Sequence, residues 1–244
     1  MSETDAIWHD VECGAYAADL ALWDELARAG DRGVLELGCG TGRVALHLAR
    51  RGHHVWGVDR DPALTAELER RAEAEGMPVH VVTADIRELD LAARFSLVVA
   101  PMQVLQMLGG EEGRRRALER CAAHLMPDGL AVAAIVEGAE AETDVDWRDL
   151  LPDVREVDAW IYSSQPLEAR GDGAAIEIHR LRQTVSPAGR LEERRHTDRL
   201  DLLDAETLEA EAVAAGLRPA GRRIIEATDA HVGSTVVLLS REGS

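Results

Sequence analysis

Three glycines lie close together in the segment Glu36-Leu-Gly-Cys-Gly-Thr-Gly-Arg43. An apolar run precedes this segment and an amphipathic run follows it, so we expect it to join a strand to a helix. Glycine permits a tight turn and the close approach of a ligand, and the free N–H groups at a helix start face that ligand. The spacing is G-x-G-x-G, and Arg43 stands where a dinucleotide-binding fingerprint has its third glycine. The segment therefore predicts a ligand-binding loop and disfavours an NAD dehydrogenase.

Carboxylates stand at the ends of three expected strands. Glu36 lies just before the glycine loop, where it would point toward an ammonium group or toward the loop itself. Asp59 follows Gly38 by 21 residues, the spacing at which a carboxylate accepts hydrogen bonds from ribose hydroxyls. Asp85 ends the third strand, where its carboxylate or the next backbone N–H can bind an adenine edge. Ligands of open α/β sheets bind at this edge, so the three acids predict a nucleoside pocket without a cation for phosphate.

The elements that position these residues alternate along residues 33–137. Short β-branched or Leu-rich runs alternate with longer amphipathic runs, which is typical of βαβ units and a mostly parallel sheet. Asp61-Pro62 predicts a helix start, and Pro127-Asp128-Gly129 predicts the turn that leads into the fifth strand. The expected strands are Val34–Leu37, His54–Val58, Val79–Val82, Ser96–Ala100 and Leu130–Val136.

The pattern changes after residue 137, where long alternating runs predict an antiparallel insertion. These runs are Val157–Ser163, Ala175–Val185 and Leu191–Leu203, and the turn Ser186-Pro-Ala-Gly189 predicts a hairpin between the last two. Next come a helix over Ala205–Ala215, closed by Gly216, and two final strands over Arg222–Ala227 and Thr235–Ser240.

We expect four parts in the chain. Residues 1–32 form a helical cap with Tyr16, Leu20, Trp23 and Leu26 on one face, and residues 33–137 form the ligand-binding α/β core. Residues 138–203 form the insertion, which could serve as acceptor site, lid or dimer contact. Residues 204–244 complete the core sheet.

The charge balance excludes several classes of partner. Lys and Arg total 27 against 45 Asp and Glu, giving a net charge of −18, and the chain has no lysine. Such a field repels polyanions, so nucleic acids and anionic membranes are not expected as partners. The three cysteines lack disulfide or C-x-x-C spacing, and the first residues do not resemble a secretory signal. No apolar stretch is long enough to span a membrane, and we expect a cytoplasmic protein.

The motifs together resemble those of class I S-adenosylmethionine-dependent methyltransferases of the small-molecule type. The resemblance covers residues 33–137 with the terminal helix and strands, and Glu36-Leu-Gly-Cys-Gly-Thr-Gly42 is close to the family's first motif. It implies a Rossmann-like α/β fold with a doubly wound, mostly parallel seven-stranded sheet, here with the helical cap and the antiparallel insertion. It also implies S-adenosyl-L-methionine as the cofactor.

The resemblance further implies roles for single residues. The glycine loop would hold the methionine part, Asp59 the ribose, and the segment from Ala100 to Gln103 would line the sulfonium and the acceptor. That segment lacks the Asn/Asp-Pro-Pro-Tyr/Phe pattern, which disfavours DNA and protein-glutamine acceptors. Arg60 would flank the adenine. The expected cofactor-binding residues are Tyr16, Glu36, Gly38, Cys39, Gly40, Gly42, Asp59, Arg60, Asp85, Ile86, Pro101 and Met102, and Gln103 is expected to contact the substrate.

Aromatic side chains make up only 3% of the chain, and most lie outside the nucleotide-binding core. In related methyltransferases the cap and the insertion cover the cofactor and shape the acceptor pocket. We therefore expect Tyr16 to act as a cofactor lid and Trp160 and Tyr162 to bind the substrate, with ordinary core packing as the alternative for Trp23 and Trp160. The rings outside the core are Trp8, Tyr16, Trp23, Trp147, Trp160 and Tyr162.

A catalytic signature is not required for this chemistry. Methyl transfer is an in-line displacement at an activated carbon, so alignment and exclusion of water are the main tasks, and a general base is optional. The histidines that could act as such a base are His9, His179, His196 and His231, and Glu137, at the carboxyl end of the fifth strand, is placed to touch the substrate. Glu137, His179 and His231 are the catalytic candidates. No cluster of His, Cys and Asp has the spacing of metal ligands, so we expect no metal.

The sequence thus predicts methyl transfer to N or O of a small molecule, with secondary metabolism as the setting. One alternative is an enzyme that uses the same cofactor for cyclisation or a sulfonium-assisted rearrangement. Another is a non-catalytic adaptor with this fold, which the intact loop and acids disfavour. The identity of the acceptor, the atom methylated and the oligomeric state stay open, and a homodimer is one possibility.

Overall fold

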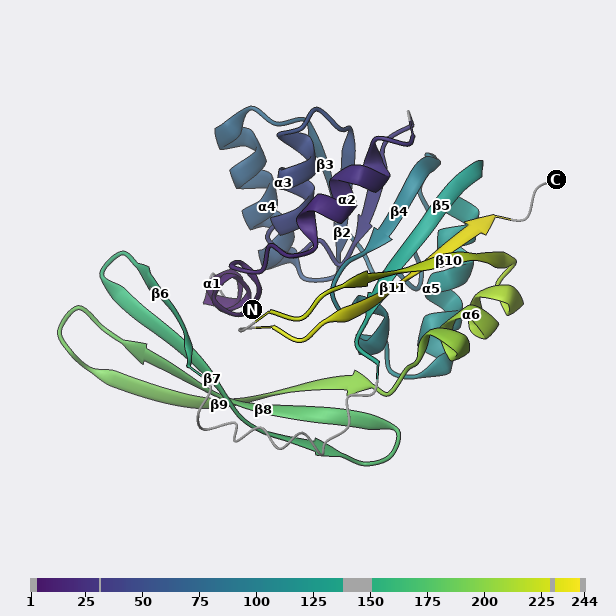
Figure 1. Ribbon diagram of the computed structural model, residues 1–244. Helices are drawn as coiled ribbons and strands as arrows, with labels where there is room; N and C mark the ends of the chain where they lie inside the picture. Colours follow the sequence, from purple (N-terminus) through teal and green to yellow (C-terminus); the bar gives the residue numbers. More distant parts are fainter. Residues whose placement is uncertain (1–3, 31, 138–150, 229–230, 242–244) are drawn as a thin grey trace.

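The computed structural model describes residues 4–30, 32–137, 151–228 and 231–241. They form a seven-stranded sheet flanked by helices and a separate four-stranded antiparallel sheet (Figure 1). The predicted fold class is confirmed. The large sheet contains β1 (Val34–Leu37), β2 (Val55–Asp59), β3 (Val79–Thr83), β4 (Phe95–Ala100), β5 (Leu125–Ile135), β10 (Leu217–Ile225) and β11 (Ser234–Arg241), in the order β10-β11-β5-β4-β1-β2-β3.

Strand β1 lies at the point where the strand order reverses. It pairs in parallel with β2 on one side and with β4 on the other, and Glu36 lies between Gly57 and Val99. All four residues of β1 are buried, as expected of an aliphatic strand covered on both faces. In open α/β sheets, the carboxyl ends of the two strands at such a reversal, here β1 and β4, border the crevice in which ligands bind.

Helices cover both faces of the large sheet. One face packs against α2 (Leu20–Ala27), α3 (Arg43–Ala49) and α4 (Pro62–Glu75), and the other against the 3-10 helix η1 (Val104–Met107), α5 (Glu111–His124) and α6 (Ala205–Ala214) (Figure 1). Two predicted helix starts are seen. Asp61 accepts a bond from Ala63 N at 2.8 Å beside Pro62, and Asp204 accepts one from Thr207 N at 2.7 Å.

The small sheet is antiparallel and lies beside the first helix. Its strands are β6 (Asp153–Val157), β7 (Trp160–Gly171), β8 (Ala175–Val185) and β9 (Leu191–Asp201), in that spatial order. Helix α1 (Thr4–Cys13) lies between this sheet and the large one in Figure 1. A small apolar cluster built on Trp8, Val11 and Tyr162 joins α1 to β7.

Three local predictions were wrong. The run Val157–Ser163 is two strands, because Asp158 and Ala159 have φ of 49° and 64° and form a tight hairpin turn. Strand β5 begins at Leu125, so Pro127–Gly129 lies inside it, at the irregular register between Phe95 and Leu97 of β4. The cap is two helices, and Tyr16 lies in the connection between them.

Candidate cofactor and acceptor site

The glycine loop follows β1 and ends at the first turn of α3. Gly40 and Gly42 have φ of 52° and 94°, a region that favours glycine, and Gly42 is the N-cap of α3. Cys39 N donates to Val58 O at 3.0 Å, which ties the loop to β2. Cys39 is buried, at 2% exposure. A Cβ on Gly38 would lie 2.6 Å from Val104 Cγ2, so the loop lies directly against the segment that follows β4.

Glu36 is the most unusual group of the site. Its side chain is 2% exposed, and its Oε2 atom has no hydrogen-bond partner among the described residues. Burial raises the pKa of this carboxyl to about 8, against opposing effects of the Arg43 guanidinium and the Ala45 backbone N–H. A buried acceptor without a partner costs free energy, and a hydrogen-bond donor from a ligand would remove that cost.

Asp59 ends β2 and holds the glycine loop from the other side. Its Oδ2 accepts from Gly40 N at 3.0 Å, and its Oδ1 accepts from Asp61 N at 2.9 Å. A carboxylate has about four acceptor sites, so these bonds leave capacity for the hydroxyls of a ribose. The side chain is half-buried.

Asp85 lies beyond β3 and is engaged by Arg87. The Arg87 guanidinium donates to it at 2.5 Å and its backbone N–H at 2.9 Å, and these bonds lower the pKa of Asp85 to about 2. Arg60 is exposed and adds to that lowering. The Ile86 side chain packs into the core, so its backbone is the part that can meet an adenine.

The segment after β4 completes the crevice. Pro101 is buried, and Met102 has φ of 53°, a conformation that costs a non-glycine residue about 1–3 kcal/mol. Gln103 is half-buried, and its carbonyl accepts from Gln106 N at 2.9 Å at the start of η1. Such a conformation beside a glycine loop is typical of residues that contact a ligand.

Tyr16 is 7% exposed and packs against groups of the loop and of the large sheet. Its ring centroid lies 4.8 Å from that of His231, in the connection between β10 and β11, and the Arg43 Cζ atom lies 5.0 Å from it. Arg43 in turn forms two bonds to Asp19, at 2.5 and 2.7 Å, and Asp19 also accepts from Trp23 Nε1 at 2.8 Å. Trp23 is therefore a core residue, as the alternative interpretation predicted.

Two of the three catalytic candidates, Glu137 and His179, have partners away from the glycine loop. Glu137 Oε1 accepts from Ala205 N at 2.6 Å and Oε2 accepts from the Thr235 hydroxyl, so this carboxylate caps α6. His179 hydrogen-bonds to Thr197 across β8 and β9, and strand alternation places it on the face opposite the Arg182 that contacts α1. His231 is the candidate that lies against Tyr16.

Trp160 and Tyr162 share the α1-facing side of the insertion but differ in exposure. Tyr162 is 8% exposed, with its ring edge-on to Trp8 at 5.3 Å, whereas Trp160 is 38% exposed at the turn between β6 and β7. Through this contact with Trp8, Tyr162 is part of the interface between helix α1 and the insertion. Trp147 lies outside the described residues.

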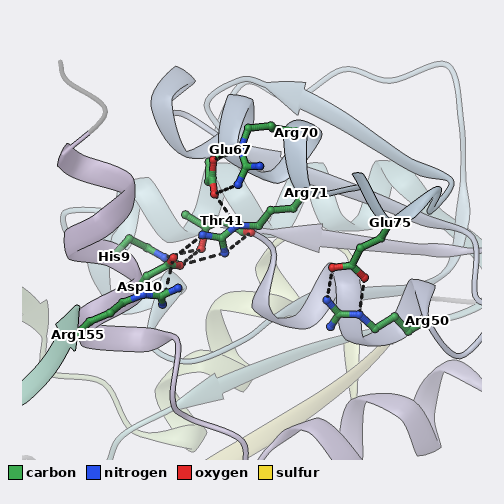
Figure 2. A network of polar contacts seen from close by, with 9 residues as sticks. All are labelled: His9, Asp10, Thr41, Arg50, Glu67, Arg70, Arg71, Glu75 and Arg155. Carbon is green, nitrogen blue, oxygen red and sulfur yellow. Dashed lines mark hydrogen bonds and ion pairs between the residues drawn. The ribbon is translucent and has the colours of Figure 1, made fainter. Parts of the chain in front are cut away.

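Of the polar network of α1, which Figure 2 shows, the sequence singled out His9 as a candidate base but not Asp10. Asp10 is 7% exposed and accepts from the Thr41 hydroxyl in the glycine loop at 2.6 Å. It is also paired with Arg71 of α4 and, at 3.2 Å, with Arg155 of β6. Burial raises the pKa of Asp10, but these bonds outweigh it and leave the pKa below its usual value. Asp10 carries no motif, so only the folded chain reveals its partners.

Within the described ranges, no group of three or more His, Cys, Asp or Glu side chains could hold a metal ion. Among the same residues, no helix is long and apolar enough to cross a membrane.

Known proteins resemble this chain in sequence and in structure. Residues 34–129 match the model of a methyltransferase domain. A dTDP-3-amino-3,6-dideoxy-alpha-D-glucopyranose N,N-dimethyltransferase of Streptomyces fradiae is 34% identical over 116 residues, which are 48% of this chain and 44% of that protein. The chain thus matches less than half of the length of this relative.

Solved structures match over nearly the whole chain. The CcbJ methyltransferase from Streptomyces caelestis is 25% identical, with a TM-score of 0.69 over 93% of this chain and 89% of that one. The sugar N-methyltransferase KedS8 from Streptoalloteichus sp ATCC 53650 is 23% identical, with a TM-score of 0.76 over 98% and 93%. At that identity KedS8 supports the fold alone.

Proposed function

We propose that this chain, in which residues 34–129 match a methyltransferase domain, transfers a methyl group from S-adenosylmethionine to an amine nitrogen of a small molecule. An amino sugar is the acceptor class we favour. The Streptomyces fradiae relative is named for N,N-dimethylation of an amino sugar nucleotide, and KedS8 is named a sugar N-methyltransferase. Oxygen is the second candidate for the methylated atom.

The observation that carries this proposal is the buried Oε2 atom of Glu36, which has no hydrogen-bond partner among the described residues. The cofactor has an ammonium group on its methionine part, and a buried acceptor at the end of β1 provides a partner for it. Asp59 lies across the loop with acceptor capacity for ribose hydroxyls, and the glycine backbone between them allows close approach. The residues present therefore fit the cofactor.

The cofactor supplies a methyl group on a sulfonium, which is already activated toward attack. The protein has to bring an uncharged amine in line with that carbon and keep water out. The amine nitrogen forms a bond to the methyl carbon while the carbon–sulfur bond breaks, which leaves S-adenosylhomocysteine and a methylated ammonium that releases a proton. His231, whose ring lies against Tyr16, is the group we propose to accept this proton.

Binding of the cofactor tests the first step. We expect S-adenosylmethionine and S-adenosylhomocysteine to bind to the full chain in calorimetry. The unaltered Glu36 is mostly protonated at pH 7, because its pKa is about 8, so pairing with an ammonium should release a proton into the buffer. Titrations in buffers of different ionisation enthalpy measure this release, and absence of binding would reject the proposal.

Turnover tests the second step. The purified chain is incubated with labelled S-adenosylmethionine and a panel of dTDP-linked amino sugars, matched sugars with hydroxyl in place of amine, and simple amines. We expect S-adenosylhomocysteine and a product heavier by one or two methyl groups from the amino sugars alone. His231→Ala should lower turnover by about 100-fold or more if His231 accepts the proton. Methylation of the hydroxyl analogues alone would favour oxygen instead.

The remaining expectations are proposals of the same kind. We propose the four-part division at residues 32, 137 and 203, a cytoplasmic location, and a partner list limited to the cofactor, a small-molecule acceptor and a second copy of the chain. The net charge of −18 supports the exclusion of nucleic acid from this list.

A further inference from the structure

Helix α1 contacts the cofactor loop with some residues and the insertion with others. Glu12 accepts from Arg182 at 2.7 Å and from the Ser164 hydroxyl at 2.7 Å, so this end of the helix is bound to β8 and β7. His9 and Asp10, within one turn of Glu12, contact Thr41 in the glycine loop. The helix therefore joins the two parts of the proposed site.

Asp10 is the point where these contacts meet. One carboxylate oxygen accepts from Thr41 of the loop and from Arg71 at 3.2 Å, and the other is paired with Arg71 and with Arg155 of β6. Figure 2 shows Arg155 and Arg71 approaching Asp10 from different elements. A single buried carboxylate thus connects the insertion, helix α4 and the glycine loop.

The direction of the hydrogen bonds fixes the state of His9. The lowered pKa of Asp10 keeps its carboxylate ionised, so it only accepts and the single Thr41 hydroxyl proton belongs to that bond. His9 Nδ1, 3.2 Å from the same Thr41 oxygen, must then be the donor. Burial lowers the pKa of His9 despite nearby Asp10, Asp59 and Glu12, and Arg43 lowers it further, so the ring is neutral with its proton on Nδ1.

The His9 ring also lies directly on the loop. A Cβ on Gly40 would be 2.2 Å from His9 Nε2, which is closer than any real contact. The position of Gly40, whose N–H is held by Asp59, therefore depends on the position of this ring.

We propose that Asp10 is a positioning residue that couples the insertion to the cofactor loop, through Arg155 on one side and through Thr41 and His9 on the other. The inference rests on the proposed function, since it assumes that the loop binds S-adenosylmethionine. A change in the position of β6 caused by an acceptor alters the affinity of the loop, and by reciprocity the cofactor alters the affinity of the acceptor side.

The test is a mutant cycle read by the affinity for S-adenosylhomocysteine. Arg155→Gln removes a charge that contacts Asp10 from the insertion, and Thr41→Val removes the hydroxyl that passes the contact to the loop. We expect Arg155→Gln to weaken binding about fivefold in the unaltered chain, the lower end of typical couplings, and to have no effect in the Thr41→Val background. Arg190→Gln, which removes an exposed arginine from the far hairpin of the same sheet, is the matched control and should bind as the unaltered chain does.

A second readout does not depend on the cofactor. Nitrogen NMR of the His9 ring in the ligand-free chain should show a proton on Nδ1, and Arg155→Gln should shift these signals while the melting temperature stays within a few degrees. Unchanged His9 signals, or an equal loss of affinity in both backgrounds, would overturn the coupling. Absence of S-adenosylhomocysteine binding to the unaltered chain would instead reject the proposed function, and the His9 signals would still decide the coupling.

Discussion

Two glutamates with little exposure, Glu36 in the large sheet and Glu12 in helix α1, have opposite environments. Glu36 at the end of β1 has an oxygen without a partner, and burial raises its pKa to about 8. Glu12, at the joint between α1 and the insertion, accepts bonds from Arg182 and Ser164. Burial raises the pKa of Glu12 too, but those bonds outweigh it, so the pKa is lowered overall.

The contrast distinguishes Glu36, whose carboxyl is available to a ligand, from carboxylates such as Glu12, whose bonds stabilise the fold. In the insertion, charged side chains of the α1-facing side bind one another, as Arg180 and Asp198 do at 3.1 Å. In the core, the buried strand β1 is otherwise aliphatic, and Glu36 is its one polar side chain. A chain that leaves one carboxyl unsatisfied in its most buried strand loses stability there, which is expected where binding is the function.

The largest effect should come from Asp19, a carboxylate near Glu36 that has hydrogen-bond partners on both of its oxygens. Asp19 is fully buried and binds Arg43 and Trp23, so Asp19→Asn leaves the Arg43 charge buried without its partner. We expect a loss of about 3–5 kcal/mol in the free energy of unfolding, measured by urea titration. Glu25→Gln, an exposed carboxylate of the same helix, is the control and should cost less than about 1 kcal/mol. A small loss in Asp19→Asn would contradict the comparison, because a buried carboxylate with partners would then contribute little to the free energy of unfolding.

Glu36→Gln should have the reverse effect on stability. Because the folded pKa of Glu36 lies above its usual value, the folded state binds more protons than the unfolded state between about pH 4.5 and 8. Stability is therefore lost as pH rises through this window, and the variant avoids that loss. We expect it to be more stable than the unaltered chain by about 3 kcal/mol at pH 7, with the difference vanishing toward pH 4.

The same variant should bind the cofactor more weakly. An amide cannot replace an ionised partner of an ammonium, so we expect affinity for S-adenosylhomocysteine to fall about 10- to 100-fold and proton release on binding to disappear. Unchanged affinity would mean that the ammonium binds elsewhere, and the contrast with Glu12 would lose its functional meaning.

The core was predictable because its signals are local. The G-x-G-x-G segment requires glycine for its backbone, and the apolar runs of β1 and β4 are long enough to be read as buried strands. The Asp61-Pro62 start of α4 is likewise decided by neighbouring atoms. The position of Glu36 inside the strand end predicted that it faces an ammonium group or the loop, but its burial and its missing partner came only from the folded chain.

The acceptor side was harder to predict because its contacts are remote in sequence. Glu12 and Arg182 are separated by 170 positions, and Glu137 looked like a substrate contact until the fold brought the start of α6 to it. His179 and Arg180 are neighbours in sequence but face opposite sides of the sheet. No motif encodes which side meets α1.

Removing the charge of Glu12 should lower the free energy of unfolding less than removing the charge of Asp19. Glu12→Gln keeps the shape but loses two bonds with charge, and we expect about 1–2 kcal/mol of destabilisation at pH 7. The folded pKa of Glu12 is lowered, so its contribution is present above about pH 4.5 and is lost as pH falls through the folded pKa. Urea titrations at pH 7 and pH 3.5 should show the difference shrink. Glu168→Gln, an exposed partner of Arg170 on β7, is the control; a difference that grows in acid would contradict the assignment.

The smallest effect should come from His179→Ala on the outer side of the insertion. The imidazole bonds to Thr197 on the neighbouring strand, and the α1-facing side of β8 is carried by Arg180 and Arg182. We expect the free energy of unfolding to change by less than about 0.5 kcal/mol, and cofactor affinity and turnover to stay at the level of the unaltered chain. If turnover fell tenfold while the melting temperature held, the base would lie on the outer side. The acceptor would then bind to the face of the insertion that points away from α1. The contacts around Glu12 would lie on the opposite face from the acceptor.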